Sequence, residues 1–298
     1  MITRPHEIHP GVTVLYGGRF HGRHPHVNAV ELAGSERVLI DPGICHEEYL
    51  ETRLDTYDLV LNTHSHPDHT SLNHLFRCPR GGHPLEKSYL EDPAALRDAQ
   101  GFPDQAYCEE WDRLVARLWE SKPFTVEQTF EDGDVLELGS LRFRVLHTPG
   151  HSIGHLSFFE ETWGILIAGD YDLNPVSAPC MSLLADLDDW HASFQRMIEL
   201  GPRVLVTGHM EAVDEDVVER MIERRKQLEA VEEQIRLLLK EPKHFAEISA
   251  FAKSHFLATI GERRRVGVWF FDVALSFCVE RLIRRGEVRM LGEQLVAA

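Results

Sequence analysis

The chain has 298 residues, of which 43% are hydrophobic and 27% charged, so it can bury one large core with or without a small additional region. Its five cysteines are scattered without a CxxC pair, which disfavours a disulfide framework or a cysteine-based zinc site. The net charge of −17 falls on residues 1–212, because basic and acidic side chains balance from Val213 onward, and this acidity disfavours binding to nucleic acid.

The sequence also carries no signal for membrane insertion or export. No apolar run approaches the roughly 20 residues that span a bilayer. The N-terminal segment Met1–Glu7 lacks the apolar stretch of a secretory signal. We therefore expect a cytoplasmic protein without a membrane partner.

Short apolar runs separated by glycine, proline and aspartate fill the first 212 residues. Several of them are rich in Val, Leu and Ile, as expected for strands that are buried on both faces. Helical patterns such as Asp188–Leu200 lie between some of these strands, which predicts an α/β fold. The predicted strands are Val12–Tyr16, Val27–Leu32, Val38–Ile40, Leu59–Asn62, Val135–Leu138, Leu141–Leu146, Ile165–Ala168 and Val204–Val206.

Residues 75–126 show no strong strand pattern and include one predicted helix, Asp104–Glu120, with an aromatic face. Because this segment follows a histidine cluster directly, it is a candidate covering insert over that cluster. Ordinary core packing of its aromatic face is the alternative.

Long helical patterns replace the strands in residues 213–298. Three predicted helices, Asp214–Lys240, Phe245–Phe256 and Val266–Arg285, are followed by a turn into a short strand at residues 286–291. This order predicts a winged-helix-like C-terminal region behind a domain formed by residues 1–212. The nearly wholly apolar run Val266–Cys278 must be buried against that domain or against a second subunit, which would give a homodimer through the C-terminal helices.

The strongest chemical signal is the segment from Thr63 to His69, which reads THSHPDH. Imidazole nitrogens and carboxylate oxygens are the usual ligands of catalytic zinc. Alternate residues of an extended segment point the same way, so His64, His66 and Asp68 can face one ion. The adjacent His69 must point elsewhere, which suits a second ion beside the first.

Three further candidate ligands follow buried strands in the same way. His151 comes after Thr-Pro-Gly, Asp170 after Ala-Gly, and His209 after Thr-Gly, each beyond the end of a predicted strand. Ligand sites in α/β proteins gather at the carboxyl ends of strands. Four such segments therefore predict one convergent metal site.

The ordered set HxHxDH, TPGHS, AGD and TGH resembles the metal-ligand signature of the metallo-β-lactamase superfamily over about residues 10–212. This resemblance implies an αββα sandwich with the site along one edge of its two sheets. Asp170 stands where true β-lactamases often have Cys, so the chain looks more like the glyoxalase II, lactonase and nuclease branches. The resemblance implies one metal ion on His64, His66 and His151, a second on Asp68, His69 and His209, and Asp170 as a bridge.

Such a site predicts a dinuclear hydrolase that uses a metal-bound hydroxide on a small ester, thioester or lactone. Zinc is the expected metal, with iron or manganese as alternatives. A nuclease or phosphodiesterase, or a mononuclear iron enzyme similar to the persulfide dioxygenases, are the competing functions. Asp68 is also the candidate proton carrier during turnover.

Three other residues are predicted to support the site. Asp41 ends the strand in Val38–Gly43, which resembles the family's early strand ending in Asp-x-Gly, and should orient a metal ligand. His155, four residues after His151, is expected to stand behind the ligands or to pack. Tyr171 follows Asp170 directly and could contact substrate.

Overall fold

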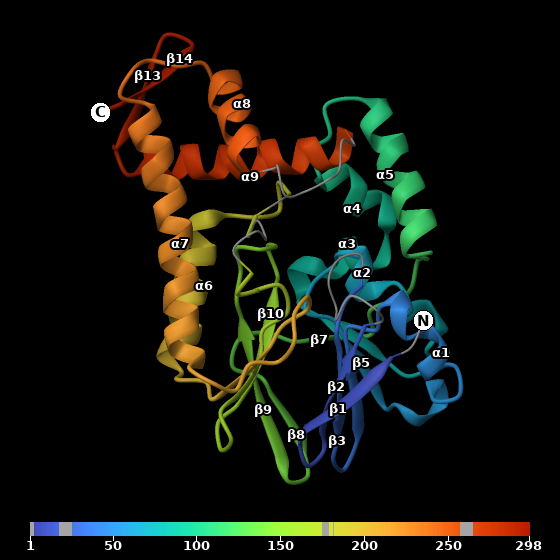
Figure 1. The fold of residues 1–298 in the computed structure, drawn as a ribbon. Coiled ribbons are helices and arrows are strands. Elements are labelled where there is room, and N and C mark those ends of the chain that lie inside the picture. Colours follow the sequence, from blue (N-terminus) through green and yellow to red (C-terminus); the bar gives the residue numbers. More distant parts are fainter. Residues whose placement is uncertain (1–2, 18–25, 175–178, 181, 257–264) are drawn as a thin grey trace.

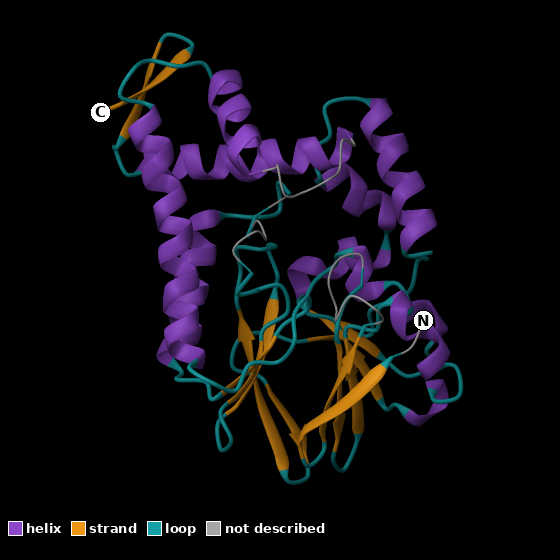
Figure 2. Ribbon diagram, in the orientation of Figure 1, coloured by secondary structure: helices purple, strands orange, loops and turns teal. Residues whose placement is uncertain are grey.

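The computed structural model describes residues 3–17, 26–174, 179–180, 182–256 and 265–298 (Figure 1). Two β-sheets pack face to face, and helices cover the outer face of each sheet (Figure 2). The predicted αββα sandwich is therefore confirmed. The C-terminal helices lie across the end of the sandwich at which the strands lead into the histidine segments (Figure 1).

The first sheet has seven strands that follow one another in chain order. Its first four strands pair antiparallel, and the remaining ones join in parallel. Val38, Leu39 and Ile40 are all buried, so this strand is covered on both faces. An unbroken apolar run is the pattern expected for such a strand. The strands are β1 (Arg4–His9), β2 (Val12–Tyr16), β3 (Ala29–Ala33), β4 (Arg37–Ile40), β5 (Leu59–Leu61), β6 (Arg80–Gly82) and β7 (Gln128–Thr129).

The second sheet has five strands, with β12 at one edge and β8 at the other. Neighbouring strands pair antiparallel except β11 and β12, which run parallel. The inward side chains of both sheets form one apolar layer that includes Val14, Ile40, Phe143 and Phe158. The strands are β8 (Val135–Leu138), β9 (Leu141–His147), β10 (Leu156–Glu160), β11 (Ile165–Ile167) and β12 (Val204–Val206).

Helices pack on the outer face of each sheet, and an apolar cluster lies between the helices and the sheet on each side. On the five-stranded sheet, α6 (Leu187–Glu199) packs Trp190 and Phe194 against Leu146 and Leu166. The α6 helix begins where the Asp186 carboxylate accepts hydrogen bonds from two backbone N–H groups of its first turn. The other α-helices in the described part of residues 1–212 are α1 (Glu47–Leu50), α2 (Pro67–Thr70), α3 (Lys87–Glu91), α4 (Pro93–Ala99) and α5 (Gln105–Leu118).

The C-terminal region has the predicted order of three helices followed by strands. These are α7 (Val217–Leu238), α8 (Phe245–Phe256), α9 (Arg265–Arg284) and the hairpin of β13 (Val288–Leu291) and β14 (Gln294–Ala297). Within the described ranges, no helix has the length and apolar character needed to cross a bilayer.

The apolar helix α9 packs against other helices of the same chain, and residues 267–272 stay partly exposed. One end packs on α5, where Val266 and Phe270 meet Trp111 and Trp119. Further along, α9 contacts α6 and α7 and contributes to the large cluster under the five-stranded sheet. These contacts bury much of α9 within one chain, and the homodimer stays a prediction.

The candidate covering insert needs one correction. Residues 80–82, which lie inside the expected insert, form β6 in the middle of the parallel part of the first sheet. The sequence did not predict this strand because two of its three residues are glycines, which are uncommon inside strands. Glycine is needed at position 81 because a Cβ there would come within 2.7 Å of the Phe130 ring. The α-helices of this segment, α3, α4 and α5, follow β6, and their role as a cover stays a prediction.

The buried His46 gives a prediction about the pH dependence of stability. Its Nε2 lies 2.9 Å from the Val27 carbonyl oxygen, and burial lowers the pKa of His46 to about 4. An unfolded histidine titrates near about 6.5, so the stabilisation is complete above that pH and is lost as the pH falls through 4. Between these values we expect the wild type to lose roughly 3 kcal/mol more unfolding free energy than His46→Gln.

Urea unfolding of both proteins at a series of pH values, with chelator present throughout, measures this difference. The glutamine variant serves as the matched control because its amide can still donate to Val27 but does not titrate. Parallel pH profiles for the two proteins would contradict the prediction.

Candidate metal centre

Four loops at one edge of the sandwich bring the seven predicted ligands together. The segment 63–69, here called the metal-ligand loop, leaves β5, and the other three loops leave β9, β11 and β12. Their side chains form two groups in which the ligand atoms of each group lie within 4.8 Å of one another. The first group is His64, His66, His151 and Asp170, and the second is Asp68, His69 and His209.

Asp170 lies between the two groups and faces both of them. Its Oδ2 is 3.3 Å from Nε2 of His151 and 3.9 Å from Nε2 of His64. Its Oδ1 is 3.0 Å from Nε2 of His69 and 3.2 Å from Nε2 of His209. A single carboxylate is therefore positioned to contact ions held by either group.

The imidazole rings are oriented by contacts at the nitrogen that faces away from the site. Nδ1 of His69 lies 2.8 Å from the Asp41 carboxylate, and Nδ1 of His64 lies 2.9 Å from the Thr63 hydroxyl. Nδ1 of His151 and of His209 each lie 2.9 Å from a backbone carbonyl oxygen. Donation from Nδ1 leaves the Nε2 lone pair directed into the site, which is the tautomer that binds a metal ion.

The predicted support residue Asp41 lies directly behind the metal-ligand loop. Besides contacting His69, its carboxylate accepts hydrogen bonds from the backbone N–H of Thr63 at 2.8 Å and from the Thr63 hydroxyl at 2.7 Å. Asp41 adopts a φ of 56°, which is uncommon for a residue other than glycine. Such backbone strain is retained where the surrounding structure fixes a side chain in a needed place.

His155 is also close to the ligands, behind Asp170. Its Nε2 accepts a hydrogen bond from the Asp170 backbone N–H at 3.3 Å, and its Nδ1 lies 3.0 Å from the Thr148 hydroxyl. The preceding Gly169 has a φ of 50°, and a Cβ there would come within 2.4 Å of the His155 ring. The glycine in the AGD motif therefore allows Asp170 to approach this histidine.

The pKa values of the site's histidines depend on burial and on the neighbouring carboxylates of Asp41, Asp68, Asp170 and Asp172. Burial holds the pKa of His64 well below its ordinary value and lowers that of His66 to about 3. Burial also opposes a charge on His209, but Asp170 and neighbouring carboxylates raise its pKa to about 10. His69 shows the same balance, with its pKa raised well above the usual range by Asp170 and Asp41. Divalent ions that bind there must displace these protons.

Several buried atoms in the site fit a metal ion as their missing partner. Among the residues that the structure describes, Nε2 of His64 forms no hydrogen bond, and Nε2 of His69 and Oδ1 of Asp170 lie 3.0 Å apart without the geometry of a hydrogen bond. Buried polar atoms without a partner are rare in folded proteins. Because imidazole and carboxylate are also the preferred donors of catalytic divalent metals, the donor set fits such ions.

Sequence reasoning missed Glu86, which holds two of the site's loops together. Its carboxylate is fully buried and accepts hydrogen bonds from the backbone N–H groups of Ser65 at 3.1 Å and of Gly154 at 2.9 Å. Both partners are backbone groups far away in sequence, so no motif marks this residue. It links the metal-ligand loop to the loop that carries His151.

The predicted substrate contact of Tyr171 is wrong. Its side chain is fully buried and stacks on Trp190 and Phe194 in the core under α6. Its hydroxyl donates to the backbone carbonyls of Thr148 and Pro149, at 3.0 and 2.6 Å. The turn after Asp170 directs this side chain away from the metal-ligand groups, so it supports the loop that carries His151.

The contact between Asp41 and His69 predicts a weaker metal site in Asp41→Asn. The amide cannot accept all the hydrogen bonds of the carboxylate, and it removes the charge that holds the His69 ring in its metal-binding tautomer. We expect metal affinity to fall about 10- to 100-fold, as is usual when such an orienting group is lost. Competition with a chromogenic chelator measures the affinity, and Asp58→Asn on the surface is the control. Unchanged affinity would contradict the orienting role.

The sequence model described as "Metallo-beta-lactamase superfamily" matches residues 23–209, which is more than half of the chain. The chain therefore belongs to the metallo-β-lactamase superfamily. The solved structure of a metallo-β-lactamase family protein from Thermus thermophilus is similar to it with a TM-score of 0.73 and 26% identity. That similarity covers 98% of this chain and all of the other, so the C-terminal region is part of the shared fold.

Two curated relatives match a smaller part. An uncharacterized protein of Aquifex aeolicus is 31% identical over 140 residues, which is 45% of this chain and 59% of the relative. A Cryptosporiopsis protein named atrochrysone carboxyl ACP thioesterase is 29% identical over 171 residues, covering 55% of this chain and 42% of that protein. The chain thus spans less than two thirds of the length of these relatives.

Proposed function

We propose that this protein is a dinuclear metal-dependent hydrolase that acts on a small ester, thioester or lactone. The observation that carries the proposal is the position of Asp170, whose two oxygens face the two ligand groups separately. A carboxylate in that place can hold two ions side by side. The family resemblance supports the same assignment of ligands.

Each ion would be held by one group and would share Asp170. Metal ions bound in such a site lower the pKa of a bound water to about 7 and polarise the oxygen of a carbonyl group. The contribution of the chain itself is to fix this arrangement. Asp41 and two backbone carbonyls orient the ligand imidazole rings. Glu86 links the metal-ligand loop to the loop that carries His151.

Asp68 is the residue that we assign to proton transfer. Its Oδ2 lies 3.4 Å from Nε2 of His209, and 6% of its surface is exposed. A carboxylate at the edge of the site can accept a proton from the attacking water and deliver it to the leaving group. Asp68→Asn separates the two roles of this residue: if the variant bound both metals and kept the full rate, proton transfer by Asp68 would be ruled out.

Charge and one relative support the proposed substrate class. Residues 1–212 carry the whole net charge of −17, which disfavours long polyanions and so disfavours a nuclease. The relative named as a thioesterase supports a carbonyl substrate, although it is 29% identical over little more than half of this chain.

The metal content of the purified protein, together with a substrate panel, tests the proposal. We expect about two zinc ions per chain and turnover of an aryl ester, a thioester or a lactone, abolished by chelator and restored by zinc. About one iron per chain with oxygen uptake on a persulfide would favour the dioxygenase alternative. Turnover of bis(p-nitrophenyl) phosphate in preference to every ester would favour the phosphodiesterase. A protein that takes up no metal would overturn the proposal.

A further inference from the structure

Each ligand group combines side chains from loops of both sheets. Apart from the shared Asp170, the first group joins two histidines from the loop after β5 of the first sheet to His151 from the loop after β9 of the second sheet. The second group joins two ligands of the same β5 loop to His209 from the loop after β12. Contacts between these loops must therefore set the spacing of the ligands, and two buried polar side chains, Glu86 and Asn28, supply them.

Glu86 connects the two loops of the first group. It follows β6 and is fully buried. One of its carboxylate oxygens accepts a hydrogen bond from the Ser65 backbone N–H at 3.1 Å, and the other accepts from the Gly154 N–H at 2.9 Å. Ser65 lies between two ligand histidines, and Gly154 lies in the loop that carries His151. A Cβ at position 154 would come within 2.8 Å of Glu86 Cγ, so glycine permits this close approach.

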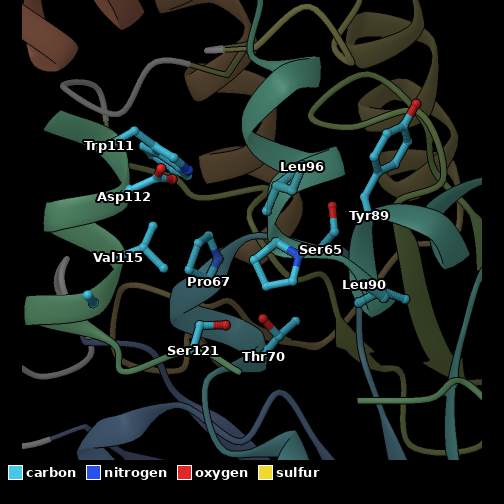
Figure 3. Close-up of a pocket in the computed structure, with 12 residues that line it drawn as sticks. Ser65, Pro67, Thr70, Tyr89, Leu90, Leu96, Trp111, Asp112, Val115 and Ser121 are labelled. Carbon is cyan, nitrogen blue, oxygen red and sulfur yellow. The ribbon is translucent and has the colours of Figure 1, made fainter. Parts of the chain in front are cut away.

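A pocket on one side of the metal-ligand loop makes this hydrogen bond more important. Ser65 and Pro67 line a pocket of about 190 Å³ between the loop and the helices α3, α4 and α5 (Figure 3). Side chains that border a pocket touch fewer atoms than close-packed ones, so packing restrains the loop less on that side. The bond between Ser65 and Glu86 adds a restraint that does not depend on this packing.

Asn28 connects the loop of His209 to the first sheet. It directly precedes β3 and is 3% exposed. Its Nδ2 donates to the backbone carbonyls of Thr207 at 3.0 Å and of Met210 at 2.7 Å, and its backbone N–H donates to the Gly208 carbonyl at 2.7 Å. A carbonyl oxygen can only accept, so both side-chain bonds require the amide nitrogen. One asparagine thus fixes the backbone on both sides of His209.

We propose that Glu86 and Asn28 are positioning residues that act on different metal ions, Glu86 on the ion of the first group and Asn28 on the ion of the second. Neither side chain is a member of the ligand groups, so each acts by holding ligand loops at the spacing that an ion requires. Asp41 holds His69 by a separate contact, so the second group should keep its geometry when Glu86 is replaced. This division rests on the two-ion centre of the proposed function and not on its substrate.

Zinc titrations of single-ion variants test the role of Glu86. His209→Ala keeps every ligand of the first group, and His151→Ala keeps every ligand of the second, so competition with a chromogenic chelator reports one ion in each background. Glu86→Gln preserves the size of the side chain but turns an amide NH₂ toward one of the two backbone N–H groups. We expect zinc affinity to fall about tenfold in the His209→Ala background and to change by less than about twofold in the His151→Ala background.

Asn28→Leu is the matched control, with the opposite expectation. Leucine is similar in volume but cannot donate a hydrogen bond, so zinc affinity should fall about tenfold in the His151→Ala background and stay nearly constant in the His209→Ala background. A general loss of packing would lower both affinities, so the crossed pattern separates positioning from stability. If Asn28→Leu does not fold, Asn28→Ser takes its place.

The same titrations distinguish a failure of this inference from a failure of the proposed function. Equal losses in both backgrounds, or unchanged affinity in both for either variant, would overturn the inference. If a single-ion background binds no zinc, the protein with all ligands decides, because each variant should weaken one stepwise affinity and leave the other. Fewer than two ions on the wild type would overturn the dinuclear function, and this inference with it.

Discussion

Asp170→Asn is expected to abolish the paired metal site and to lower hydrolysis by about 10³-fold or more. The carboxylate faces both ligand groups, at 3.0 Å from His69 and 3.3 Å from His151, so its loss affects both ions at once. Loss of a group that merely orients a ligand costs about 10- to 100-fold in affinity, and loss of a shared ligand should exceed that. Titration with zinc should show at most one ion bound tightly per chain.

A nearby buried carboxylate provides the control for this experiment. Asp172 lies two residues further along the chain, is 4% exposed and belongs to neither ligand group, and burial raises its pKa. We expect Asp172→Asn to keep two metal ions and most of the activity. Two tightly bound ions in Asp170→Asn would contradict the bridging position, and an equal loss in both variants would point to a general disturbance of the β11–β12 edge.

Arg281→Met is expected to destabilise the protein by about 3–5 kcal/mol. Arg281 of α9 donates to Asp188 of α6 and to the Glu232 carboxylate of α7, each at 2.6 Å. Glu232 is 3% exposed, so the substitution leaves a charge buried beside weaker partners. Breaking a buried pair from one side typically costs that amount. Urea unfolding at constant zinc concentration measures the free energy.

Two further variants separate the buried pair from surface electrostatics. Arg284 lies one helical turn from Arg281 and pairs with Asp186 and Asp188, but nearly half of its side chain is exposed, so Arg284→Met should cost at most about 1 kcal/mol. Replacing both partners, in Glu232→Leu with Arg281→Met, should recover much of the lost stability. Equal effects for the two arginine variants would refute the explanation from burial.

The ligand set could be predicted from sequence because its residues are chemically unusual and locally marked. Three histidines and an aspartate within residues 64–69 cannot be explained by helix or strand patterning. Each other ligand follows a glycine at a strand end. The structure brings all seven together. Asp41 was predicted differently, from the resemblance of Val38–Gly43 to the family's early strand that ends in Asp-x-Gly.

The sequence analysis did not predict strands in which polar residues interrupt the apolar pattern, such as β10. All five residues of β10 are buried, but Ser157 and Glu160 are polar and interrupt the apolar run. Their partners explain the burial, since Ser157 lies 2.9 Å from the Thr148 hydroxyl and Glu160 accepts from the Trp163 backbone N–H. These contacts exist only after folding, so the sequence shows two polar residues where a buried strand was needed.

The direction in which a side chain points from a turn could not be predicted from the sequence either. Tyr171 follows a ligand directly, yet the backbone of the β11 loop turns it into the core. Glu86 lies in a segment without any motif and reaches the site through backbone partners alone. Direction in loops depends on local φ and ψ values, which residue identity constrains weakly outside glycine and proline.

The contact between α5 and α9 limits how this protein can be recombined with its relatives. Trp111 and Trp119 of the segment after β6 share one apolar cluster with Val266 and Phe270 of the C-terminal region, and Trp269 donates to the Gln100 carbonyl. A chimera that exchanges only one of these segments would place unmatched aromatic surfaces against each other. We expect such hybrids to aggregate and those that exchange both segments together to fold, so that the two stretches behave in evolution as one inherited module.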